Sequence, residues 1–593
     1  MKFWKTTLAA ALGVFLALIA CTLLSLLIFS GLASVFSSTP TIPVEGVLRL
    51  DLSQMEIVEQ TQEANPMETL QNGDIKAKIG ILDAVFALEK AAADPSVKFL
   101  YLLPDGLSGG MAQIEELRKA VVNFKDSGKP VIAYTENPST GGYYLASAAD
   151  KVYMTSYQGG MTTITGLSSQ LVFLKDLLDK LGVNVQLIRH GKYKSAGEMY
   201  IRNDISNENR QQYETFLGSI WNSISSSVAQ SRGMAPEEFD ALIDNLELNS
   251  PEDFLENGLV DGLCTREELY GRLADLYVTD DYRNVKFMEF ADYTMLKVST
   301  NYRSREKLAV IYADGEIIDG KEKKEVAGDR FAKIIAEVRR DSSVKAVVLR
   351  VNSPGGSVLA SEKIKAEIEL LRAAKPVIAS YGSYAASGGY WISNSCDRIF
   401  SDASTLTGSI GVFSMIPEFS GTAKELAHVN VVTINSNRHS DMYGMMRPLD
   451  NREIAYMQES VDSIYEQFTG IVAEGRDLDR GFVDSIAQGR VWAGSDALGI
   501  GLVDEIGGLE DALRHAALVA DSEKGSELQE WQIASYPKPL TLAEQFSEML
   551  GMESGEDHLA KTPFKGIALA FKDIDKTVGG KVYARLPYAI TIR

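Results

Sequence analysis

Two stretches of the sequence resemble each other over their whole length, "SVKFLYLLPDGLSGGMAQ" at residues 96–113 and "SVKAVVLRVNSPGGSVLA" at residues 343–360. A second pair follows at nearly the same spacing, "KPVIAYTENPSTGGYYLASAAD" at 129–150 and "KPVIASYGSYAASGGYWISNSCD" at 375–397. Similarity that recurs in the same order along a chain indicates a duplicated domain.

Each copy alternates strand-like and helix-like stretches. "KAVVLRV" and "PVIASY" are β-branched apolar runs, whereas "SEKIKAEIELLRAA" places Ile364, Ile368 and Leu371 on one helix face. This order predicts βαβ units and an α/β fold with mainly parallel sheets. Functional loops gather at the carboxyl ends of such strands, where "SPGGS" and "SYAASGGYW" are expected.

The domain plan also includes an N-terminal anchor. After Lys2 and Lys5 no charged residue occurs before Glu45, and about 20 apolar residues suffice to cross a bilayer. Residues 1–44 are therefore predicted to form a cytoplasmic tip and one transmembrane helix, with the rest of the chain beyond the membrane. The two repeats are expected at 45–300 and 301–535, followed by a tail, 536–593, to which no role is assigned.

Composition excludes several classes of function. The formal net charge of −21 argues against a nucleic-acid-binding surface. Three widely spaced cysteines form neither a disulfide framework nor a zinc pattern. No metal and no cofactor are expected.

The loop "SPGG" is a candidate oxyanion hole. It follows a predicted strand and precedes a predicted helix, so Gly355 and Gly356 could direct backbone N–H groups at a carbonyl oxygen. The alternative is a tight turn that needs glycine only for its backbone angles. In the first repeat "GLSGG" matches the G-x-S-x-G pattern of serine hydrolases, but Ser108 aligns with Pro354 and is not favoured.

Ser409, in "DASTLTGSIGVF", is a candidate nucleophile that would need a base. None of the five histidines lies in a Gly-rich loop, although His190 and His439 occupy near-equivalent places in the two repeats and stay in contention. A desolvated, neutral lysine is the other known base.

Lys194, in "YKSA", fits the lysine alternative. It aligns with Ser440 or Asp441, so the second repeat lacks this lysine. Ser409 aligns in turn with Thr162 or Thr163, so the first repeat lacks that serine. We therefore expect the repeats to share one dyad, which places the site where they meet. The alternative is that Lys194 is a solvated surface residue.

The motifs "SPGG", "ASGGYW", "TGSIGVF", "YKSA" and "GRVWAGSDALGIGLVDEIGG" together resemble the long, double-domain form of bacterial signal peptide peptidase A. The resemblance implies tandem ClpP/crotonase-like domains, a homotetramer and a membrane-anchored serine protease of the protease IV type. It implies Ser409 as nucleophile, Lys194 as general base with Lys192 as its rival, and Gly355 and Gly356 as oxyanion hole.

Further expectations follow from the resemblance. The substrates would be remnant signal peptides and other apolar segments, cleaved through an acyl-enzyme at the periplasmic face of a bacterial inner membrane. Two alternatives stay open, a crotonase-type CoA-thioester enzyme and a non-enzymatic membrane scaffold. The first needs neither the serine nor the lysine, and the second would not need to keep both.

Overall fold

The computed structural model describes Gly13 and residues 40–61, 76–298, 304–323, 325–538 and 582–586. Apart from Gly13 and residues 40–44, the expected anchor at 1–44 lies outside this part of the chain and stays a prediction. In the described ranges, none of the helices combines the length and apolar character needed to cross a bilayer.

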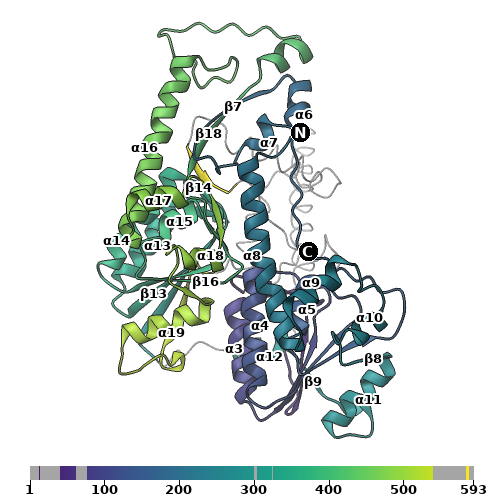
Figure 1. The fold of residues 1–593 in the computed structure, drawn as a ribbon. Coiled ribbons are helices and arrows are strands. Elements are labelled where there is room, and N and C mark those ends of the chain that lie inside the picture. Colours follow the sequence, from purple (N-terminus) through teal and green to yellow (C-terminus); the bar gives the residue numbers. More distant parts are fainter. Residues whose placement is uncertain are drawn as a thin grey trace, which may run out of the picture.

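The N-terminal half is built on a parallel sheet of six strands (Figure 1). Its order is β8 (Gly262–Cys264), β6 (Lys151–Thr155), β5 (Val131–Thr135), β4 (Val97–Leu103), β1 (Gly46–Asp51) and β9 (Phe287–Glu289). Strands β2 (Met55–Val58) and β3 (Ala77–Gly80) form a separate pair. The helices of this half are α3 (Ile81–Ala93), α4 (Met111–Lys125), α5 (Thr140–Ala146), α6 (Lys175–Lys180), α7 (Glu198–Ile201), α8 (Asn207–Arg232), α9 (Pro236–Asp244), α10 (Pro251–Glu256), α11 (Arg266–Tyr277) and α12 (Phe290–Lys297).

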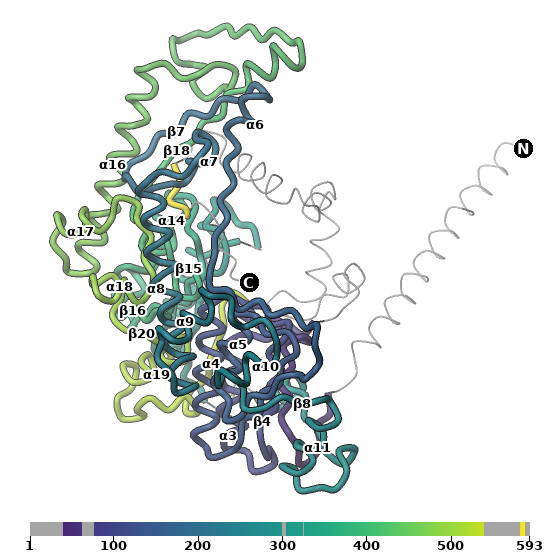
Figure 2. The backbone as a smooth tube through the Cα atoms, turned by 45° about the vertical axis from the view of Figure 1, so that its right-hand side comes forward, coloured from purple at the N-terminus to yellow at the C-terminus, as the bar shows by residue number. Residues whose placement is uncertain are grey.

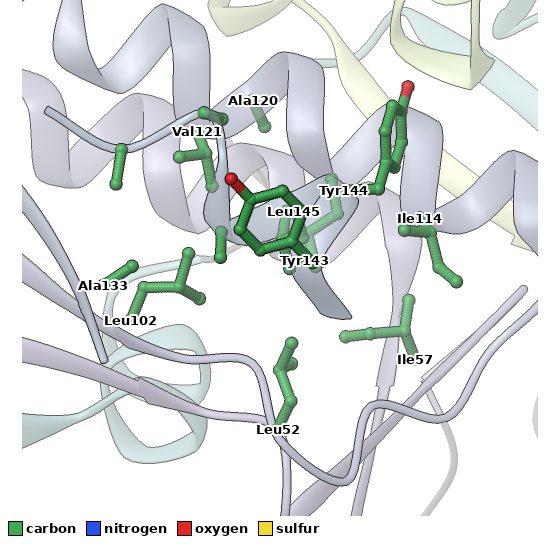
Figure 3. Close-up of a cluster of buried hydrophobic side chains, with 14 of the residues drawn as sticks. Leu52, Ile57, Leu102, Ile114, Ala120, Val121, Ala133, Tyr143, Tyr144 and Leu145 are labelled. Atoms are coloured by element: carbon green, nitrogen blue, oxygen red, sulfur yellow. The ribbon is translucent and has the colours of Figure 1, made fainter. Parts of the chain in front are cut away.

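The core of this half lies between the sheet and the helices α3, α4 and α5 (Figure 3). Leu102 and Ala133 contribute to it from the strands, Ile114 and Val121 from α4, and Tyr143 from α5. Strands with both faces covered read as continuous apolar runs, which is the pattern of "FLYLL" in β4.

The C-terminal half repeats this plan with an eight-stranded sheet. Its main path is β19 (Val491–Ala493), β17 (Leu406–Gly408), β15 (Val377–Ala386), β13 (Val344–Ser353), β10 (Lys307–Asp314) and β21 (Gln532–Tyr536), and β16 (Arg398–Ser401) and β20 (Glu505–Ile506) extend it beside β15. The helices are α13 (Gly328–Arg340), α14 (Val358–Arg372), α15 (Gly388–Ser393), α16 (Asn451–Arg476), α17 (Arg480–Ile486), α18 (Gly494–Gly499) and α19 (Leu509–Ala520). The predicted strands and helix appear as β13, β15 and α14, so the duplicated α/β organisation is confirmed.

A third sheet joins the two halves. Its order is β12 (Val326–Ala327), β11 (Ile317–Ile318), β14 (Gly355–Ser357), β22 (Tyr583–Arg585), β18 (Val412–Glu418) and β7 (Asn184–His190). Strand β7 comes from the first repeat and pairs antiparallel with β18 of the second over seven residue pairs, from Val412 with His190 to Glu418 with Asn184. The repeats therefore form one continuous structure at the place where the split site is expected.

A buried ion cluster also connects the halves. The guanidinium of Arg350, on β13, contacts Glu59 and Glu116 of the N-terminal half at 2.6 Å each. It also donates to the Ser380 hydroxyl and the Tyr381 carbonyl. All three charged side chains are buried, so the cation compensates two carboxylates that water cannot reach.

Arg350→Met is expected to lower the free energy of unfolding by about 3–5 kcal/mol, because it leaves two buried carboxylates without their cation. The matched control is Arg49→Met, which breaks a half-exposed pair with Glu289 and is expected to cost about 0–1 kcal/mol. Urea unfolding of both variants measures the difference. Equal effects would contradict this account of the cluster.

Candidate active site

Ser387 lies at the turn between strand β15 and helix α15. Its backbone angles, φ +56° and ψ −113°, fall in a region that residues with a Cβ rarely occupy. Its N–H donates to the carbonyl oxygen of Gly408 over 2.8 Å, which holds the turn in place. A serine on a strained strand-to-helix turn is the arrangement of the nucleophile in α/β-hydrolases.

The first repeat provides an internal comparison. Alignment of the Gly-Gly pairs places Thr140 opposite Ser387, and Thr140 is an ordinary residue of helix α5. The N-cap of that helix, Ser139, has relaxed extended angles of φ −95° and ψ 165°. The strained turn is therefore a feature of the second repeat, not of the shared fold.

Lys194 reaches this turn from the other half of the same chain. It lies between β7 and α7, and its Nζ is 2.8 Å from the Ser387 Oγ and 3.0 Å from the Ser409 Oγ. The Nζ also donates to the Ser409 carbonyl oxygen over 3.2 Å. Lys194 and both serines are fully buried.

The environment of Lys194 favours its neutral form. Burial lowers the pKa of this side chain well below its ordinary value, because the ammonium loses its hydration. The polar groups that its Nζ contacts are hydroxyl and carbonyl oxygens of serines, not carboxylates. A neutral amine in a dry site can accept a proton, which is the property a general base requires.

Ser409 is on the opposite side of the lysine, in the turn between β17 and β18. Its φ is +51°, and its N–H donates to the Arg490 carbonyl oxygen over 2.7 Å. That N–H is therefore engaged within the fold. With both its hydroxyl and its carbonyl oxygen on the Lys194 Nζ, Ser409 fixes the position of the amine.

Gly355 and Gly356 lie beside Ser387, not beside Ser409. A Cβ on Gly355 would lie 2.6 Å from the Gly388 nitrogen, and one on Gly388 would lie 3.0 Å from the Gly356 nitrogen. Gly355 has φ +97°, which glycine adopts without strain. The backbone nitrogens of Gly356 and Gly388 thus meet next to the Ser387 turn, where an oxyanion hole is useful.

Comparison with known proteins agrees with this geometry. The chain matches Peptidase family S49 twice, over residues 123–279 and 369–523. It is 39% identical to "Protease 4" of Haemophilus influenzae, over 78% of this chain and 77% of that protein. The chain belongs to Peptidase family S49. It is a serine peptidase, which sets aside the CoA-thioester enzyme and the scaffold.

Other relatives of this peptidase support the same assignment. "Protease 4" of Salmonella typhi is 34% identical over 79% of this chain and 76% of its own length. "Serine protease SPPA, chloroplastic" of Arabidopsis thaliana is 32% identical over 72% of this chain and 63% of its own. Among solved structures, ClpP1 of Listeria monocytogenes overlaps 35% of this chain at a TM-score of 0.24; at that score the ClpP/crotonase-like name stays a prediction.

The other candidate residues of the peptidase lie apart from Lys194. Lys192 is exposed, with its Nζ over the Tyr193 ring. His190 contacts Asp462 and His439 contacts Glu453, each through Nδ1. Thr163 pairs with Ser139 in the first repeat, next to Thr162. Ser108 lines a cavity of about 310 Å³ whose lining includes Glu59, Asp314 and Asn352 but no residue of the Lys194 site.

Sequence reasoning singled out Ser409 and missed Ser387. The signal was available, because Ser387 aligns with Thr140 just as Ser409 aligns with Thr162 or Thr163. What the sequence does not display is the left-handed turn at Ser387 or its contact with Lys194.

One group of potential metal ligands occurs among the described residues, formed by His439, Asp450 and Glu453. Arg447 already pairs with Glu453 at 2.7 Å. This cation lies where a metal ion would need negative charge, and the group is far along the fold from Lys194, at the start of α16. The chemistry at Lys194 requires no metal or cofactor.

Proposed function

We propose that this peptidase is a membrane-anchored endopeptidase that uses a Ser/Lys dyad, with Lys194 as general base and Ser387 as nucleophile. The observation that carries the proposal is the buried Lys194 Nζ at 2.8 Å from a hydroxyl on a strained turn. Ser409, the nucleophile expected from the sequence, becomes the residue that positions the lysine.

Two arguments favour Ser387 over Ser409. A neutral amine has two N–H donors and one lone pair, and the Ser409 carbonyl oxygen can only accept. If the Ser409 hydroxyl accepts the second N–H, the lone pair faces the Ser387 hydroxyl, which then donates its proton. In addition, the backbone nitrogens of Gly356 and Gly388 adjoin Ser387, so an oxyanion formed there would be stabilised.

The reaction then proceeds in two stages. The Ser387 Oγ attacks a peptide carbonyl carbon while its proton passes to the Lys194 Nζ, and the oxyanion is held at Gly356 and Gly388. The C–N bond breaks, and Lys194 returns the proton to the leaving amine. Water next attacks the Ser387 ester with Lys194 again as base, which releases the acid and restores the hydroxyl.

Remnant signal peptides in a bacterial inner membrane are the proposed substrates. The support is the resemblance to signal peptide peptidases, the apolar segment within residues 1–44 and the dry, apolar surroundings of Lys194. These features place the catalytic halves on the periplasmic side, where cleaved signal peptides remain at the bilayer surface.

A homotetramer is the proposed assembly. Between β18 and α16 the chain forms an arm that extends beyond the body of the molecule (Figure 2). The arm exposes Val429, Val432 and Ile434, the last by 93%. Apolar side chains gathered on an extended arm are typical of a surface that another subunit covers.

The substrate proposal is tested with the full chain reconstituted in lipid vesicles. A synthetic signal peptide is expected to be cleaved with a kcat/KM about tenfold or more above that of a length-matched polar peptide, because an apolar site discriminates by buried apolar contact. Ser387→Ala is the inactive control. Equal kcat/KM for both peptides would overturn the substrate class but leave the dyad intact.

A further inference from the structure

A short segment of the C-terminal tail occupies the cleft next to Ser387. Strand β22 lies between β14 and β18 in the third sheet and is antiparallel to both (Figure 1, yellow). Ala584 pairs with Gly356, and Tyr583 pairs with Phe413. Addition of an extended segment between existing strands is a general way in which proteins bind peptides.

Backbone hydrogen bonds extend the pairing on both sides of β22. The Leu586 N–H donates to the Pro354 carbonyl oxygen over 2.7 Å, and the Val358 N–H donates to the Val582 carbonyl oxygen over 3.4 Å. The segment is thus held by its main chain along the whole "SPGGS" loop, on both sides of Ala584.

The side chains of the segment are held as firmly as its backbone. Tyr583, Ala584 and Leu586 are buried and belong to three different hydrophobic clusters. The Tyr583 ring lies 6.1 Å from the Phe413 ring, and the Arg585 guanidinium pairs with Glu316 at 3.3 Å. Such contacts recognise a particular sequence and are more than a strand edge requires.

The carbonyl oxygen of Ala584 lies where the mechanism needs the substrate carbonyl. A Cβ on Gly388 would lie 3.1 Å from this oxygen and 3.0 Å from the Gly356 nitrogen, and a Cβ on Gly355 would clash with it. The oxygen therefore sits among the backbone groups that adjoin Ser387. It occupies the site at which the oxyanion of a cleaved peptide would form.

We propose that the C-terminal tail is an intramolecular substrate of this peptidase, cleaved between Ala584 and Arg585. The inference rests on the proposed dyad. The Ser387 Oγ bonds to the Ala584 carbonyl carbon, the bond to the Arg585 nitrogen breaks, and Lys194 transfers the serine proton to that nitrogen. Water then releases the new carboxylate at Ala584, and the peptide Arg585–Arg593 departs.

Until it is cleaved, the tail competes with every other substrate. Strand β22 fills the position between β14 and β18 that an added peptide would take. Because the tail is tethered, its effective concentration at the cleft is high. Cleavage removes the contacts of Arg585 and Leu586 and weakens the hold of the remaining segment.

Intact-mass spectrometry of the full chain tests the proposal. We expect wild type to lose Arg585–Arg593 and Ser387→Ala to keep it. Ala584→Gly preserves the strand and should still be cleaved. Ala584→Trp cannot fit a fully buried position, so its tail should stay intact and leave the cleft, and hydrolysis of an added peptide should be free of the initial lag expected of wild type.

The outcomes separate this proposal from the proposed function. Wild type that hydrolyses an added peptide but keeps its tail overturns self-cleavage alone. Wild type that hydrolyses neither overturns the proposed function as well. Hydrogen exchange of Ser387→Ala gives a readout without catalysis, since residues 582–586 should be protected there and exchange freely when Ala584→Trp is added. Loss of the tail from Ser387→Ala would assign the cut to another protease.

Discussion

Ser387→Ala is expected to lower kcat by at least about 10⁴-fold, the scale on which hydrolases lose rate when their nucleophile is removed. The reason is geometric, because Ser387 combines a hydroxyl at 2.8 Å from the Lys194 Nζ with a turn that adjoins Gly356 and Gly388. Hydrolysis of an apolar fluorogenic peptide by the full chain measures the effect.

Ser409→Ala provides the matched control for this prediction. It removes one of two oxygens by which Ser409 holds the amine, since the carbonyl oxygen at 3.2 Å remains. Misplacement of a catalytic group costs about 10²-fold, so this variant should keep measurable turnover. A covalent serine-directed inhibitor should label Ser387. The reverse result, with Ser409→Ala inert and Ser387→Ala active, would return the nucleophile to Ser409.

Lys194→Met is expected to lower kcat by about 10⁴-fold, the upper range for loss of a general base. Methionine has a similar length and no proton-accepting nitrogen, so it removes the base with little change in packing. Lys192→Met is the control, because Lys192 is exposed and two positions away. Equal losses in both variants would contradict the assignment of the base.

The pH profile gives a second readout for Lys194. Only the neutral amine can accept the serine proton, so kcat/KM should rise with pH as Lys194 loses its proton. Since burial lowers the pKa of this lysine, the plateau should be reached well below the pH at which an ordinary lysine titrates. A rise only at the ordinary lysine pKa would mean that the site is solvated.

Much of the fold could be predicted because the duplication displays it twice. The strands β13 and β15 and the helix α14 follow from local apolar patterns, and repetition shows that these patterns are structural. Lys194 was found by the opposite test, since it is present in one repeat and absent from the other. Comparison between repeats thus separates residues that build the fold from residues that carry its chemistry.

Long-range pairing could not be predicted in the same way. The strand β22 is part of a tail without a counterpart in the first repeat, and its short sequence carries no signal for the partners it finds in β14 and β18. The choice between Ser387 and Ser409 depends on a backbone strain that only the assembled structure imposes.

The sheet that joins the halves has a consequence for the birth of the molecule. Lys194 and Ser387 are separated by 193 positions, and contacts between such distant residues form late because the intervening chain must first be organised. During synthesis the N-terminal half emerges first and holds the base without its nucleophile. A ribosome-bound chain is therefore catalytically silent, and hydrolytic competence arises only after the second half has emerged and docked.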